Sequence, residues 1–74
     1  MWDDGNIVYC ANKEEQSITP YRIIGNNYDL VYIENCFTGA LSFICPKLFD
    51  KIVHYGSNAD WFQTPEEAYN WLIK

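Results

Sequence analysis

The sequence predicts a small α+β domain, in which an antiparallel sheet of three to four strands carries one or two C-terminal helices on one face. Its 74 residues are enough for one domain, residues 1–74. It contains 3 Trp, 6 Tyr and 4 Phe, and 49% of its residues are hydrophobic, which is enough apolar material for a folded core. Segments typical of strands fill the first two-thirds of the chain, and helix signals fill the last third.

Four segments are rich in the β-branched and aromatic residues that favour strands. Short turn signals separate them, so we expect an antiparallel meander. Pro20 precedes the second segment, where a strand tolerates proline. The predicted strands are residues 6–11, 21–24, 28–34 and 41–45, with a polar loop at 12–17 and turns at 25–27 and 38–39.

Two helices are predicted after the strands. Pro46 fits the first turn of a helix over residues 46–55, and the competing prediction there is a strand over 51–55. The clearest local signal is Thr64-Pro65-Glu66-Glu67, which combines an N-cap, a proline at the first helical position and a capping-box glutamate. This helix should run to the C-terminus. Its predicted core stripe is Ala68, Trp71 and Leu72, with Tyr69 and Ile73 beside it.

The third predicted strand carries large apolar residues on both faces. Tyr28, Leu30 and Tyr32 share one face, and Val31 and Ile33 share the other. A sheet with one solvated face should alternate apolar and polar residues instead. Two short helices can cover one face only, so the other must curl into a barrel or be covered by a loop or a second chain. A two-fold symmetric homodimer is one expected solution.

Composition excludes several classes of protein. The formal net charge is −5, with 5 basic and 10 acidic residues, which argues against direct nucleic-acid binding because phosphate contacts need Lys and Arg. Three cysteines without a CxxC pair do not form a disulfide framework, and the acidic N-terminus is unlike a signal peptide. No apolar run approaches the roughly 20 residues of a membrane span. We therefore expect a cytoplasmic protein with reduced thiols.

No motif for catalysis or for a cofactor stands out. His54 is the single histidine, and the helical wheel places it on the polar side. Cys10, Cys36, Cys45 and His54 could form a Cys3His zinc set, but their wide spacings lack the close pairs of structural zinc sites. The adjacent acidic pairs are explained by solvation or helix capping. We expect no catalytic residues, no metal and no cofactor.

Two aromatic residues are the candidate binding residues. Trp61 and Phe62 lie in residues 56–63, a segment whose Gly, Ser, Asn and Asp predict a loop. Large aromatics in a loop either plug the core or anchor a partner, and plugging is the commoner role in so small a chain. The predicted partner-binding residues are Asp60, Trp61 and Phe62, with Glu14 and Glu15 as an acidic rim.

The function these features predict is non-enzymatic binding and modulation of another protein. Seven Asn, eight Ile and six Tyr indicate AT-rich codons, which fit a bacterial or phage-encoded chain. Acidic side chains can aid solubility alone, or they can stand where a protein expects phosphates. The second reading fits a phage-type inhibitor of a host nucleic-acid-binding or defence enzyme. The alternative function is an oligomeric small-ligand binder with an aromatic pocket between subunits.

Overall fold

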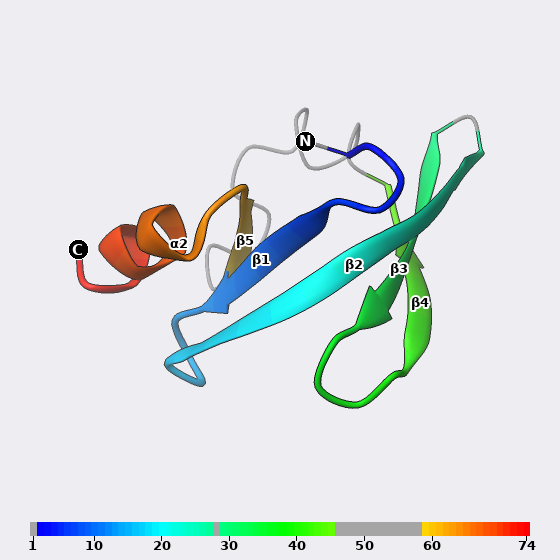
Figure 1. The fold of residues 1–74 in the computed structure, drawn as a ribbon. Coiled ribbons are helices and arrows are strands. Elements are labelled where there is room, and N and C mark those ends of the chain that lie inside the picture. Colours follow the sequence, from blue (N-terminus) through cyan, green and yellow to red (C-terminus); the bar gives the residue numbers. More distant parts are fainter. Residues whose placement is uncertain (1, 28, 46–58) are drawn as a thin grey trace.

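A computed structural model describes residues 2–27, 29–45 and 59–74, which form an antiparallel sheet with a helix against it (Figure 1). The spatial order of the strands is β4-β3-β2-β1-β5. The elements are β1 (Ile7–Asn12), β2 (Ser17–Asn27), β3 (Leu30–Asn35), β4 (Leu41–Ile44), β5 (Ala59–Phe62) and α2 (Pro65–Leu72). The predicted fold class is confirmed, with a fifth strand where a loop was predicted. The predicted helix over 46–55, the competing strand over 51–55 and His54 lie outside the described residues.

β2 is much longer than predicted, and two features explain this. Pro20 lies inside the strand, where β2 pairs with β1 and β3 has already ended, so its missing N–H costs no ladder bond on that side. Its carbonyl accepts a 3.0 Å hydrogen bond from the Cys36 N–H. Gly25 lies in the strand next to a β-bulge instead of in the predicted turn. A Cβ atom there would lie 3.7 Å from the Tyr32 Cδ2, so the Tyr32 ring covers this glycine.

The predicted turn at Thr38-Gly39 is confirmed. Gly39 adopts a φ of +76°, which glycine accepts without a steric cost. The Asn35 side chain holds the turn, because its Oδ1 accepts from the Phe37 N–H at 2.8 Å and from the Thr38 N–H at 3.2 Å. This tight connection makes β4 the antiparallel neighbour of β3.

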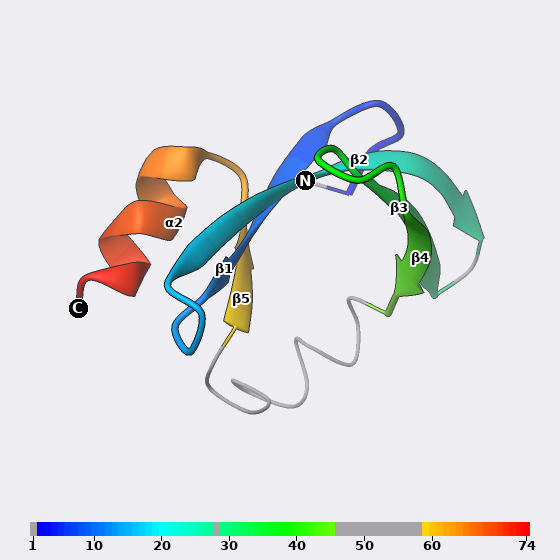
Figure 2. The ribbon, with the colours of Figure 1, turned by 90° about the horizontal axis from the view of Figure 1, so that it is seen from below.

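The sheet curves strongly, and its concave face holds the core (Figure 2). Val31 and Ile33 point to this face, as the alternation in the third strand predicted, and both are buried. They cluster with Val8 and Ile23, and four partly buried side chains pack against the cluster: Trp2, Tyr21, Ile44 and Trp61. The N-terminal segment is held against β2, because Asn26 Nδ2 donates to the Trp2 carbonyl oxygen at 2.9 Å.

The helix α2 packs on the other face, over β1 and β5. Ala11 of β1 and Ala68 of α2 are both fully buried, on two elements that contact each other. The predicted start of the helix is confirmed: Thr64 Oγ1 accepts from the Glu67 N–H at 3.2 Å. The same hydroxyl donates to Glu67 Oε1 at 3.1 Å. The helix covers only the β1–β5 end of this face, so the β3–β4 end lies outside its reach.

Candidate functional site

The two aromatics singled out in the sequence are part of β5 and pack within the protein. Trp61 pairs with Cys10 on the concave face of the sheet. Its ring centroid lies 5.8 Å from that of Trp2 in an edge-on arrangement and 5.3 Å from that of Tyr21. Phe62 points to the opposite face, where its ring lies 5.7 Å from that of Trp71 in α2. Trp61 therefore packs against the core cluster and Phe62 packs against α2, and both residues are half-buried.

Two of the predicted acidic residues act on one thiol. Glu15 comes from the turn between β1 and β2, and Asp60 comes from β5. Burial is the largest cause, and together with the negative charges of Asp60 and Glu15 it raises the pKa of Cys10 to about 11. The structure thus brings Glu15 and Asp60 to the same region. The Cys10 thiol stays protonated at neutral pH, which makes it a poor nucleophile.

The turn that carries Glu14 and Glu15 lies beside α2. The Lys13 Nζ atom stands 4.4 Å from the Trp71 ring centroid, a cation–π contact between the turn and the helix. Within the turn, Asn12 Oδ1 accepts from the Glu15 N–H at 3.0 Å. Both glutamates are exposed. These contacts fix the acidic turn next to the C-terminal half of the helix.

The exposed side of α2 carries two large apolar residues that the sequence placed next to the core. Tyr69 is 57% exposed and Ile73 is 64% exposed. Their spacing from Glu66 puts all three on one helix face, with Asn70 between them. A depression of about 460 Å³ lies over the first turns of the helix, lined by Pro65, Glu66, Tyr69 and Asn70. We call Glu66, Tyr69, Asn70 and Ile73 the α2 surface.

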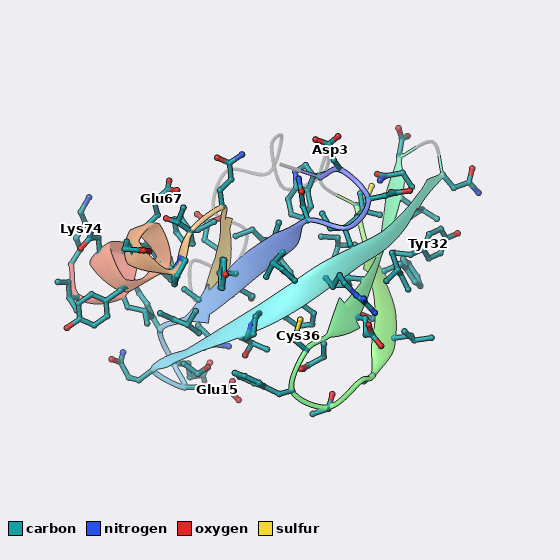
Figure 3. All side chains as sticks on the ribbon, viewed as in Figure 1. Asp3, Glu15, Tyr32, Cys36, Glu67 and Lys74 are labelled. Atoms are coloured by element: carbon teal, nitrogen blue, oxygen red, sulfur yellow. The ribbon has the colours of Figure 1, made fainter. Side chains whose placement is uncertain are left out.

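A second exposed apolar surface lies at the opposite end of the sheet. Phe37 is 72% exposed, Leu41 is 69% exposed and Phe43 is 63% exposed. Phe43 pairs across the strands with Tyr32, which Figure 3 shows at the end of the molecule far from Glu15 and Glu67. We call this set the outer sheet surface: Ile24, Tyr32, Phe37, Leu41 and Phe43. It is the part of the second sheet face that α2 does not reach.

The described residues contain neither a cluster of metal-binding side chains nor a helix that could span a membrane. Within residues 2–27, 29–45 and 59–74, no three His, Cys, Asp or Glu side chains stand close enough to hold a metal ion. The helix α2 has neither the length nor the hydropathy to cross a membrane. Comparison of the chain with protein-family models, with curated proteins and with solved structures finds no match.

Proposed function

We propose that this chain is a non-enzymatic protein that binds and modulates another protein, and that the α2 surface makes the contact. One observation carries the proposal: Tyr69 and Ile73 are each more than half exposed on a helix face that begins with Glu66. Glu66 and Glu67 lie at the start of this helix, and Glu14 and Glu15 lie in the turn beside its other end. An aromatic anchor within a polar rim is a common plan for protein interfaces.

The charge distribution supports a partner with a basic surface. The whole chain has a net charge of −5, and the acidic residues near α2 come from two separate parts of the sequence. Such a surface attracts a basic protein surface and raises the rate of encounter with it. Basic surfaces are typical of nucleic-acid-binding enzymes, because they contact phosphates. A phage-type inhibitor that blocks such a host enzyme with carboxylates is the role we propose.

A variant-controlled capture experiment tests the proposal. The protein is immobilised and exposed to lysate from a low-GC bacterium, and captured proteins are identified by mass spectrometry. The captured amount of a true partner should fall at least tenfold when the immobilised protein carries Tyr69→Ser or Ile73→Ser. It should be retained with Phe37→Ser, which alters an exposed aromatic at the other end of the molecule. If neither helix substitution changes the captured amount, the α2 surface is not the binding surface.

Kinetics with the purified partner separate the two contributions. Reversal of Glu14 and Glu15 to Lys should slow association and weaken its dependence on salt, because these acids guide the encounter. Tyr69→Ser should speed dissociation instead, because Tyr69 is the anchor. An association rate that does not change with salt would contradict the basic partner.

A further inference from the structure

The strand β4 has the properties of an unprotected sheet edge. It pairs with β3 on one side and has no neighbouring strand on the other among the described residues. Its sequence, Leu41-Ser42-Phe43-Ile44, contains no charge and no proline. The opposite edge differs, because β5 carries Asp60 and its two aromatics are packed against the core and α2. Proteins usually blunt exposed edges with charge, proline or a covering element, and the sequence of β4 contains neither charge nor proline.

The backbone of β4 presents its hydrogen-bonding groups at two residues. The Asn35 N–H donates to the Ala40 carbonyl at 2.9 Å, so this pair is a hydrogen-bonded position of the β3–β4 ladder. Hydrogen-bonded and non-hydrogen-bonded pairs alternate along an antiparallel ladder. Ser42 therefore bonds to Ile33, and the N–H and C=O groups of Leu41 and Phe43 point away from β3. The same two residues expose their side chains on the outer sheet surface.

We propose that β4 pairs with β4 of a second copy of this chain, antiparallel about a two-fold axis perpendicular to the sheet. The two five-stranded sheets then join into one continuous sheet. Such an axis maps the outer face of one copy onto the outer face of the other. In the register that pairs only β4 residues with each other, Leu41 of one copy lies opposite Phe43 of the other, and the two Ser42 residues meet at the axis. Four main-chain hydrogen bonds form between the two strands. The Leu41 side chain of each copy also packs beside the Phe43 side chain of the other.

The pairing geometry and the charge favour a second copy as the occupant. The proposed pairing covers the main chain of β4 and the exposed side chains of Leu41 and Phe43, whereas Tyr32 and Ile24 lie on strands away from the joined edge. The interface is therefore smaller than the roughly 1,200 Å² of standard interfaces, so association should be weak and should depend on concentration. The surface is also neutral where the copies meet, since Glu34 is paired with Arg22. Glu15 of the turn and Glu67 of α2 lie at the other end of the molecule from Tyr32, so they add little repulsion between the two copies (Figure 3).

Molar mass in solution tests the pairing. Sedimentation equilibrium from about 1 μM to 1 mM should show the mass rising from 8.7 kDa toward twice that value. Phe43→Lys and Leu41→Lys should each raise the dissociation constant at least tenfold. Tyr69→Lys is the matched control, because it adds the same charge at an exposed aromatic of α2 and should leave the dimer intact. The proposal is overturned if the wild-type protein is monomeric at every concentration. It is also overturned if Phe43→Lys leaves the dissociation constant of the dimer unchanged.

Cross-linking tests the register, in a Cys36→Ser background because Cys36 is exposed. Ser42→Cys should form an intermolecular disulfide under mild oxidation, because residues opposite each other at a non-hydrogen-bonded position bring their Cβ atoms within reach. Gln63→Cys, an exposed position beyond β5, should not. A Ser42→Cys protein that is dimeric yet gives no disulfide refutes the β4 pairing. The inference is independent of the proposed function, since the dimer should survive the Tyr69 and Ile73 substitutions that abolish partner capture.

Discussion

Replacement of Trp61 by Ala tests directly whether this ring belongs to the core. Truncation of a buried Trp costs about 3–5 kcal/mol, and the partial burial of Trp61 places it near the lower end, about 3 kcal/mol. Its contacts with Trp2 and Tyr21 each contribute about 0.5–1.5 kcal/mol beyond buried area and are included in that loss. A chain of 74 residues has a total stability of about 4–11 kcal/mol. The substitution should therefore remove a large part of it.

Thermal unfolding followed by circular dichroism measures the effect. A loss of about 3 kcal/mol in a domain of this size lowers the Tm by about 12–24 °C. Trp61→Phe is the matched control, since it keeps a ring beside Trp2 and Tyr21 and should lose much less. A Trp61→Ala protein that unfolds cooperatively within about 4 °C of the parent, a shift worth no more than about 1 kcal/mol, would refute the packing role. It would also return Trp61 to the list of binding residues.

Two further predictions concern the helix cap and the buried thiol. Thr64→Ala should lower the free energy of unfolding by about 1 kcal/mol in urea titrations, because the Glu67 N–H loses its acceptor, and Thr64→Ser should retain most of that stability. Cys10 should resist thiol reagents at pH 8 while exposed Cys36 reacts, and it should become reactive only as the pH approaches 11. Because burial raises the pKa of Cys10 in the folded state above its ordinary value of 9.0, the stability from its neutral form is complete below pH 9. It is lost as the pH rises toward about 11, and Cys10→Ala should flatten this part of the pH profile.

Local signals in the sequence predicted much of the fold. The cap at Thr64, the turn at Gly39 and the alternation of Val31 and Ile33 each depend on a few neighbouring residues, and the structure contains all three. The strand β5 was missed because Ala59–Phe62 has only four residues and follows polar, loop-like composition. Its conformation is fixed by pairing with β1, a contact distant in sequence. Gly25 was misplaced for a similar reason, since a glycine under a cross-strand ring looks like a turn glycine in sequence.

Only part of the candidate site could be predicted from the sequence. The acids Glu15 and Asp60, which come from separate segments, both lie near Cys10, and their role as binding residues stays a prediction. Tyr69 and Ile73 were assigned beside the core stripe because a helical wheel cannot show how wide the contact with the sheet is. Ala68 is fully buried while Tyr69 and Ile73 are more than half exposed, so the contact of the helix with the sheet is narrow. A sequence shows which residues share a helix face, but the size of the neighbouring side chains decides how much of that face is buried.

The positions of the two exposed surfaces allow both proposed contacts at once. β4 and the outer sheet surface lie at one end of the strand order, and α2 packs on β1 and β5 at the other. Pairing of β4 with a second copy would therefore leave both α2 surfaces free at opposite ends of the joined sheet. A partner that is itself dimeric could engage both, and its apparent affinity would rise without any new contact, provided its two sites match that separation. Loss of the dimer through Phe43→Lys should then weaken binding to a dimeric partner while leaving the single-site affinity unchanged, whereas Tyr69→Ser should weaken the single site itself.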